Sequence, residues 1–361
     1  MENINLKKIG IINAGAWGTA VAKVLGGLGH DVEIWDFMKD VVEEINTKHS
    51  NSRYLLGVSL TGNIRASEDL QQVVSGKDFL IIATPSLYIL DIVKKIVPVS
   101  DIMEGKPTIG ILTKGFIQGQ NGPALITKAM EDYLPGFYKD NLVYISGPSH
   151  AEEVARGKLT GLISASRNGM NSIRFRELLS GSNLMVYSSF DIIGVQTCGA
   201  MKNVIAVAYG ILDALMEISE NFGDNTESML LAAGLNEIQL LGKALGSEYP
   251  ETFTSLAGVG DLDVTCRSKY GRNRKFGREV VNDRKLDEFS DIDDLITNIN
   301  RIGYLPEGVV ATRFVKQLIK QHKLKLPIAE SVYRILNKEE QPLEAVQEMV
   351  KNLNMQSSSK K

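Results

Sequence analysis

Short apolar runs alternate with helix-period segments over the first half of the chain. The runs are rich in β-branched residues and apolar on both faces, which predicts strands buried in a parallel sheet. They cover residues 8–12, 31–35, 78–83, 108–112 and 142–146, and helical patterns begin near Ala16, Asp40, Tyr88 and Gly122. This alternation predicts a doubly wound, Rossmann-like α/β domain over residues 1–190, with function-bearing residues just after the strand ends.

The pattern changes near residue 190. Helix-period apolar positions dominate from there, without a convincing strand, over residues 194–220, 226–245, 308–321 and 328–336. We therefore predict an all-helical second domain over residues 191–352. A solvated acidic connection over residues 283–294 and a flexible polar tail over residues 353–361 complete the predicted organisation.

Composition narrows the class of protein. With 361 residues, 43% of them apolar and 23% charged, the chain predicts a folded protein of two or three domains. A net charge of −3 gives no reason to expect a nucleic-acid partner. Two cysteines, Cys198 and Cys266, are too few for a disulfide framework, and no His/Cys/Asp cluster has metal-ligand spacing, so we expect a reduced, cytoplasmic setting without a metal. No signal peptide is readable, and apolar runs such as residues 79–83 are far shorter than the roughly 20 residues of a membrane span.

A degenerate dinucleotide motif follows the first predicted strand. Residues 13–18 read N-A-G-A-W-G, which is G-x-G-x-x-G with asparagine in place of the first glycine. Asparagine tolerates left-handed backbone angles, while Gly15 permits close approach to a pyrophosphate and Gly18 permits close helix–strand packing. On its own, the motif is equally consistent with a dinucleotide-binding loop and with a plain strand–helix turn. Asp36, 18 residues after Gly18 at the end of the second strand, favours a dinucleotide because a ribose-binding carboxylate belongs there.

The same strand end bears on the choice of cofactor. The Asp36 carboxylate would accept a hydrogen bond from a ribose 2′-OH and repel a 2′-phosphate, and the next residue is Phe37 rather than an arginine. We predict NAD(H) as the preferred cofactor. NADP remains possible, since Lys39 is close by.

Two lysines are candidates for chemistry. Lys114 follows a buried strand, and Lys202 lies in a largely apolar helix. Lys202 is either a snorkelling side chain or a general acid for a carbonyl oxygen, its pKa lowered by burial and a second cation. Further on, Asp261 lies between glycines and a Thr-Cys pair, and Arg272-Asn273 lies in a basic cluster. These segments are typical either of solvated loops or of a site for a small phosphomonoester.

Taken together, the motifs resemble the NAD(P)-dependent sn-glycerol-3-phosphate dehydrogenases of the soluble bacterial type. The resemblance runs in order from about Lys8 to Arg334, through residues 13–18, 113–115, 147–152, 198–204, 260–266 and 272–273. It implies reversible hydride transfer between the nicotinamide and C2 of dihydroxyacetone phosphate, giving sn-glycerol 3-phosphate for phospholipid synthesis. It also implies a helical domain that binds this small phosphorylated substrate, and a homodimer.

Residue roles follow from the resemblance by position. Lys202 matches the proton donor and acceptor, and Lys114 and Asp261 complete the catalytic set. Substrate-contacting positions are Lys114, Gly147, Ser149, Lys202, Asp261, Gly271, Arg272 and Asn273. Cofactor-contacting positions, including those read from the motif itself, are Gly15, Ala16, Trp17, Gly18, Asp36, Phe37, Lys114, Ala151, Arg272, Leu305 and Glu307. Gly271 stands where the family commonly has serine, and Phe37 where it often has arginine; losing the serine hydroxyl should cost about 1 kcal/mol of binding.

Two other interpretations stay open. A related dehydrogenase of the 6-phosphogluconate or 3-hydroxyacyl-CoA type would share the fold plan, although such hydroxyacid enzymes usually use a histidine base and only His150 lies in a motif. A non-catalytic NAD-sensing protein would keep the nucleotide site and lose the chemistry. Retention of both lysines and Asp261 argues against the sensor.

Overall fold

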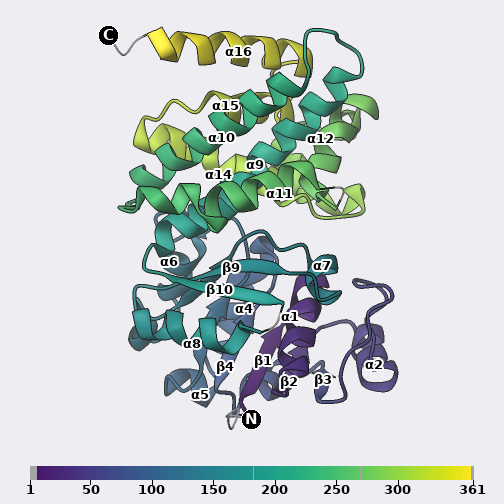
Figure 1. The fold of residues 1–361 in the computed structure, drawn as a ribbon, viewed down its shortest axis with the longest axis vertical. Helices are drawn as coiled ribbons and strands as arrows, with labels where there is room; N and C mark the ends of the chain where they lie inside the picture. Colours follow the sequence, from purple (N-terminus) through teal and green to yellow (C-terminus); the bar gives the residue numbers. More distant parts are fainter. Residues whose placement is uncertain (1–5, 182, 269, 359–361) are drawn as a thin grey trace. The chain divides into compact units, whose positions relative to one another are not determined.

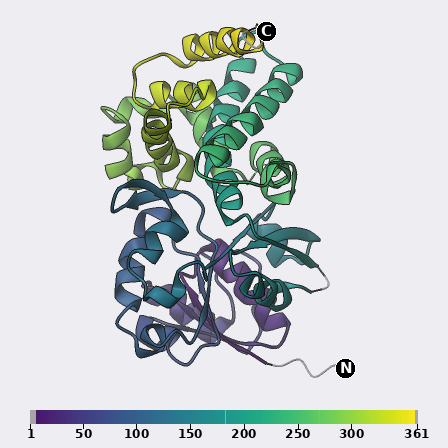
Figure 2. The same cartoon turned by 90° about the vertical axis from the view of Figure 1, so that its left-hand side faces the viewer.

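The chain forms two compact units. The computed structural model describes residues 6–181, 183–268 and 270–358. The first unit runs to Thr113 and resumes over Ile126–Ile192, and the second comprises Lys114–Leu125 and the chain from Ile193 onward (Figures 1 and 2). The main division therefore falls at Ile192, close to the expected residue 190. The sequence patterns did not anticipate that residues 114–125 join the second unit.

An eight-stranded sheet organises the first unit. Its order is β10-β9-β8-β5-β4-β1-β2-β3, and the strands are β1 (Lys8–Ile12), β2 (Asp31–Trp35), β3 (Ile64–Ser67), β4 (Phe79–Ile82), β5 (Thr108–Ile111), β8 (Val143–Ser146), β9 (Thr160–Ala165) and β10 (Leu184–Ser189). The five predicted strands are confirmed as β1, β2, β4, β5 and β8. The expectation of a wholly parallel sheet is wrong at one edge, because β9 pairs antiparallel with β8 and β10 continues parallel to β9.

Helices cover both faces of this sheet, as a doubly wound fold requires. They are α1 (Ala16–Gly27), α2 (Lys39–Lys48), α3 (Leu70–Val74), α4 (Ile89–Ile96), α5 (Ser100–Met103), α6 (Ile126–Glu131), α7 (Ala151–Ala155) and α8 (Gly169–Leu179). A Cβ on Gly10 of β1 would lie 2.3 Å from the Val73 carbonyl oxygen of α3, and one on Gly110 of β5 would lie 2.5 Å from the Phe175 ring of α8. Gly10 pairs with Leu80 of β4, and Gly110 pairs with the next residue of that strand, Ile81. Because successive residues of a strand point to opposite faces of a sheet, α3 and α8 lie on opposite faces.

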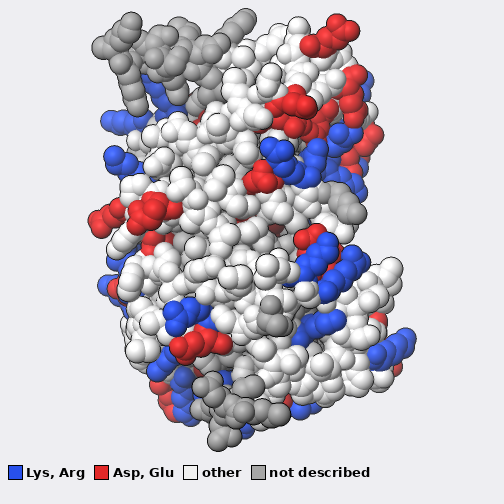
Figure 3. All heavy atoms as spheres, in the orientation of Figure 1, with Lys and Arg blue, Asp and Glu red and all other residues white. Residues whose placement is uncertain are grey.

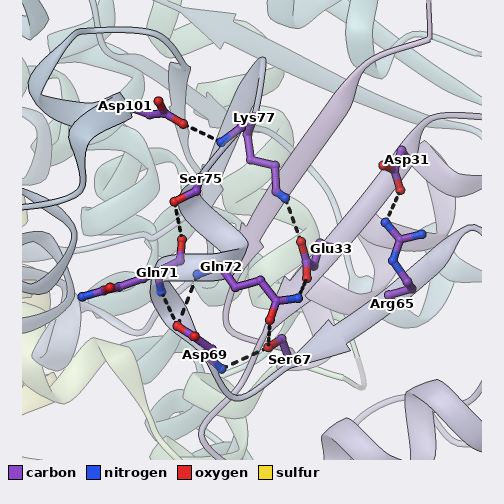
Figure 4. A network of polar contacts seen from close by, with 11 residues as sticks. Asp31, Glu33, Arg65, Ser67, Asp69, Gln71, Gln72, Ser75, Lys77 and Asp101 are labelled. Carbon is purple, nitrogen blue, oxygen red and sulfur yellow. Dashed lines mark hydrogen bonds and ion pairs between the residues drawn. The ribbon is translucent and has the colours of Figure 1, made fainter.

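A buried polar network ties α3 to β2 (Figure 4). Glu33 of β2 is buried and pairs with the Lys77 ammonium at 2.7 Å, and the Gln72 side-chain amide of α3 donates to the same carboxylate. The Asp69 carboxylate accepts the backbone N–H groups of Gln71 and Gln72 and so caps α3. Since a buried charge is tolerated only when paired and hydrogen-bonded, these contacts fix α3 against β2.

The second unit is helical, with one small hairpin. Its helices are α9 (Ile192–Met216), α10 (Asp224–Ala244), α11 (Asp261–Arg267), α12 (Arg272–Asn282), α13 (Ile292–Thr297), α14 (Glu307–His322), α15 (Pro327–Leu336) and α16 (Pro342–Ser358). The hairpin of β6 (Phe116–Gly119) and β7 (Gly122–Leu125) packs against α14. The helix predicted to begin near Gly122 begins instead at Ile126, because Gly122 starts a strand.

Two predictions about polar segments are wrong. The acidic stretch 283–294 is not simply a solvated connection, since Leu286 and Ile292 are buried and α13 begins inside it. The predicted tail is helical as far as Ser358, where α16 ends, and residues 359–361 lie outside the described part.

The apolar helix α9 and the distribution of surface charge are the features that bear on a membrane or a charged partner. Among the described residues one helix, α9, is long and apolar enough to cross a membrane, and its apolar window is entirely buried, as expected for the core helix of a folded domain. On the face drawn in Figure 3, Lys and Arg side chains lie interspersed with Asp and Glu side chains.

Candidate active site

The turn between β1 and α1 has the geometry of a dinucleotide loop. Asn13 adopts a left-handed backbone angle, with φ of 85°, and its side-chain oxygen accepts the Gly15 N–H at 3.2 Å. A Cβ on Gly18 would lie 2.1 Å from the Asn13 carbonyl oxygen, so only glycine allows α1 to start this close to β1. Asparagine thus replaces the first glycine of the motif by supplying both the backbone angle and a local hydrogen bond.

The start of α1 fits a pyrophosphate. Gly15 is the N-cap and offers no side-chain acceptor, so the first N–H groups of this 12-residue helix keep their capacity to bind an anion. Ala16 and Trp17 pack with Ala151 of α7 in one apolar cluster around Ala20. The structure therefore brings three of the predicted cofactor-contacting residues together within the first unit.

The two residues that follow β2 differ sharply in exposure. Asp36 is only 1% exposed, and its carboxylate accepts the N–H groups of Ala14 at 2.9 Å and Met38 at 3.0 Å. Burial raises the pKa of Asp36, and these backbone hydrogen bonds act in the opposite direction. Phe37, in contrast, is 69% exposed. Phe37 is therefore the residue of this pair that is accessible to a ligand.

Two lysines converge on one buried carboxylate in the second unit. Asp261, the first residue of α11, is fully buried, and its Oδ2 atom lies 2.9 Å from the Lys114 ammonium. The Lys202 ammonium, on α9, pairs with Asp261 Oδ1 and donates to the Thr265 hydroxyl at 2.8 Å. The three catalytic residues predicted from the sequence therefore lie in contact.

The electrostatics of this cluster favour proton transfer near neutral pH. Burial lowers the pKa of Lys202 to about 7; Lys114 adds to this effect, and Asp261 opposes it. Burial of Asp261 would raise its own pKa, but the two lysines outweigh burial and lower it. A carboxylate that stays ionised thus holds a lysine poised between its two protonation states. Across the described residues, no group of three or more His, Cys, Asp or Glu side chains is placed to hold a metal ion.

A tight turn presents Asp261 to the lysines. Residues Leu256–Gly260 form a π-helical turn immediately before α11, and a Cβ on Gly258 would lie 2.0 Å from the Phe253 carbonyl oxygen. Such turns are frequent at functional sites. Thr265 follows Asp261 by one helical turn, and its hydroxyl donates to the Asp261 carbonyl oxygen at 2.6 Å. The two Lys202 partners therefore share one face of α11.

Close helix packing fixes α12 against α9. A Cβ on Gly210 of α9 would lie 1.9 Å from the Arg274 carbonyl oxygen, and one on Gly277 of α12 would lie 2.2 Å from the Val207 carbonyl oxygen. The Asp213 carboxylate of α9 also pairs with Arg274 at 2.5 Å. This crossing holds the start of α12, which carries Arg272 and Asn273, in a fixed position on the helix that carries Lys202.

Asn273 is already hydrogen-bonded within the protein. Its amide nitrogen donates to the Asn203 side-chain oxygen at 2.9 Å, and its own oxygen accepts the Gly308 N–H at 2.9 Å. Asn273 therefore ties together α9, α12 and the start of α14. Arg272, beside it, is exposed and makes no ion pair with another described residue. Arg272 is thus an accessible cation at this helix start, whereas Asn273 orients its surroundings.

The remaining predicted residues divide between the two units. Glu307 begins α14 and Leu305 lies two residues before it, both half-buried in the second unit. Gly271 is the buried N-cap of α12, where a Cβ would lie 3.0 Å from the Thr265 carbonyl oxygen. Gly147 and Ser149 belong to the first unit, where the Ser149 hydroxyl donates to the Gly147 carbonyl oxygen at 2.9 Å.

Sequence reasoning did not assign roles to several residues of these sites. Thr265 binds Lys202 directly, and its position four residues after Asp261 is a signal for a shared helix face. Asn203 and Asn51 are buried amides that hold Asn273 and the Ala14 carbonyl oxygen respectively. The local sequence pattern gives no signal for these two asparagines, because each binds a partner more than 30 residues away along the chain.

Comparison with known proteins identifies the family. Residues 8–172 match the sequence family described as NAD-dependent glycerol-3-phosphate dehydrogenase N-terminus, and residues 191–347 match its C-terminus. A Treponema denticola protein named glycerol-3-phosphate dehydrogenase (NAD(P)+) is 54% identical over 95% of this chain and 98% of its own length. A Bacillus subtilis protein of the same name is 35% identical over 92% of this chain and 90% of its own length. The crystal structure of glycerol-3-phosphate dehydrogenase from Coxiella burnetii superposes with a TM-score of 0.83 at 32% identity, covering 96% of this chain and 99% of that one.

These matches span both units and agree with the predicted order of motifs. They do not favour a 6-phosphogluconate or 3-hydroxyacyl-CoA type of dehydrogenase, because both halves of the chain match one family. The predicted fold, an N-terminal Rossmann-like unit and a helical C-terminal unit, is confirmed. The chain belongs to the NAD-dependent glycerol-3-phosphate dehydrogenase family.

Proposed function

We propose that this protein interconverts dihydroxyacetone phosphate and sn-glycerol 3-phosphate with NAD(H), and so supplies glycerol 3-phosphate for phospholipid synthesis. The observation that carries the proposal is the convergence of Lys114 and Lys202 on the buried Asp261 carboxylate. A protein that only sensed NAD would have no use for a buried lysine whose pKa is lowered to about 7.

Each side chain has a role in this reaction. NADH, when bound at the start of α1, supplies the hydride. Lys202 donates the proton to the substrate carbonyl oxygen during reduction and takes it back during oxidation. Lys114 contributes a second positive charge that stabilises the developing alkoxide, and Asp261 holds both ammonium groups in place. The exposed Arg272 guanidinium binds the substrate phosphate through charge-assisted hydrogen bonds. The phosphate contact then orients the reacting carbon.

A direct assay tests the function. Purified protein is mixed with NADH and dihydroxyacetone phosphate as the only varied substrate, and absorbance at the NADH band is followed. We expect saturable NADH oxidation. Unphosphorylated dihydroxyacetone serves as the matched control, and its kcat/KM should be at least about 100-fold lower because it lacks the phosphate contact. Folded protein that binds NADH without oxidising it would support the sensing hypothesis instead.

The exposed Phe37 predicts a preference between the two nicotinamide cofactors. An apolar ring offers no partner for a 2′-phosphate, so we expect kcat/KM for NADPH to be at least about tenfold below that for NADH, equivalent to roughly 1.4 kcal/mol. Steady-state kinetics with dihydroxyacetone phosphate measure both values. In Phe37→Arg, a guanidinium at the same exposed position should reduce the difference in kcat/KM between NADH and NADPH. Equal or better use of NADPH by the unmodified protein would refute the preference.

A homodimer and a cytoplasmic location complete the proposal. Size-exclusion chromatography with light scattering distinguishes a mass of one chain from a mass of two. The cytoplasm suits the proposed activity, because NAD(H) and phosphorylated trioses are available there, and fractionation of cells tests this location.

A further inference from the structure

The Asp36 carboxylate is hydrogen-bonded within the protein through both of its oxygens. One oxygen, Oδ2, accepts the Ala14 N–H at 2.9 Å and lies 3.4 Å from the Asn13 side-chain amide, while Oδ1 accepts the Met38 N–H at 3.0 Å. With 1% of its surface exposed, the side chain offers a ligand almost no accessible oxygen. A carboxylate that binds a ribose hydroxyl needs an accessible lone pair aimed at the ligand.

The following peptide unit, between Ala14 and Gly15, is held by side chains as well. The Ala14 carbonyl oxygen accepts hydrogen bonds from the Asn51 amide at 2.8 Å and the Thr19 hydroxyl at 3.0 Å. Asn51 also donates to the Thr19 hydroxyl at 2.8 Å. All of these residues belong to the first unit. Ala14 lies between Asn13, with its left-handed backbone, and the N-cap Gly15, and its N–H and C=O are therefore fixed by separate buried side chains.

We infer that Asp36 is a positioning residue that holds the dinucleotide loop in its binding conformation and does not read the ribose 2′ position. The inference rests on the proposed use of NAD(H). Asn13 pays a conformational penalty for its left-handed angle, and the carboxylate offsets it by binding the next peptide and the Asn13 side chain. Since the pyrophosphate, which NADH and NADPH share, binds at this loop, loosening the loop weakens both cofactors alike.

The test separates positioning from ribose recognition. Asp36→Asn keeps the side-chain shape but turns one acceptor into a donor that faces a backbone N–H. The Kd values for NADH and NADPH are measured by fluorescence titration without substrate. Both should rise by the same factor, about tenfold, leaving their ratio within twofold of that of the unmodified protein. Asp31→Asn is the matched control, because Asp31 lies on the same strand in an exposed pair with Arg65 at 2.7 Å (Figure 4); it should leave both Kd values unchanged.

A gain of tenfold or more in NADPH affinity relative to NADH would overturn the inference, as would unchanged Kd values for both cofactors. A second measurement uses the unmodified protein and does not depend on a variant that folds. The analogue of NADH lacking the adenosine 2′-hydroxyl should bind within threefold of NADH, whereas a loss of tenfold or more would show that this hydroxyl is recognised and would count against the inference. If the unmodified protein binds no NADH at all, that result contradicts the proposed function itself. It differs both from equal weakening of the two cofactors and from a selective change in NADPH affinity.

Discussion

Lys202→Ala is expected to lower kcat for dihydroxyacetone phosphate reduction by about 10³- to 10⁴-fold, because it removes the general acid of the reaction. The side chain is buried on α9, and its ammonium contacts Asp261 and Thr265. Alanine leaves no group that can deliver a proton at this position. A cavity next to an ionised carboxylate admits water, but water placed there is a far weaker acid than an ammonium whose pKa is lowered to about 7.

Cofactor binding should survive this change. The dinucleotide loop lies in the first unit and Lys202 in the second, so the Kd for NADH measured by fluorescence should stay within about threefold of the unmodified value, or roughly 0.6 kcal/mol. Lys243→Ala, an exposed lysine in the last turn of α10, is the matched control and should retain full kcat. Turnover of Lys202→Ala within tenfold of the unmodified protein would remove Lys202 from the proton-transfer role.

The sequence predicts the strands and helices that carry strong local patterns, and it misses those that depend on distant partners. β1 and β2 follow from continuous apolar runs, and their bounds match the prediction. β3 was not predicted because only two of its four residues, Ile64 and Ala66, are buried. The hairpin of β6 and β7 leaves the first unit because it packs against α14, nearly 200 residues further along the chain, a contact that no local pattern records.

The site shows the same limit at the level of single side chains. Lys114 and Lys202 were candidates from the sequence itself, but their grouping with Asp261 came from a resemblance, since 147 residues separate Lys114 from Asp261 and 59 separate Lys202 from it. The motif alone also carries no information on the surroundings of Asp36. Spacing places a carboxylate at the end of β2, but only the structure shows that the neighbouring backbone has already engaged its oxygens.

Asp261→Ala should cost the protein stability as well as activity. Removing one partner from a buried ionic cluster leaves the remaining charges uncompensated, which typically costs about 3–5 kcal/mol. Here two ammonium groups would face each other around an empty position, and the pKa of Lys202 would fall further because the charge that raises it is gone. We therefore expect a lower midpoint of chemical unfolding, together with a fall in kcat of at least about 100-fold.

The unfolding measurement also has a predicted pH dependence. The two lysines lower the folded-state pKa of Asp261 below its ordinary value, so the carboxylate contributes stability at neutral pH that is lost as the pH falls through the acid range toward that lowered pKa. The stability gap between the unmodified protein and Asp261→Ala should accordingly be widest near neutral pH and shrink under acid conditions. Asp263→Asn is the matched control: Asp263 lies two residues away on α11, half-exposed and paired with Arg267 at 2.7 Å, where loss of an exposed ion pair costs at most about 1 kcal/mol. Equal unfolding midpoints for Asp261→Ala and Asp263→Asn at pH 7 would show that the buried carboxylate does not hold the lysines together.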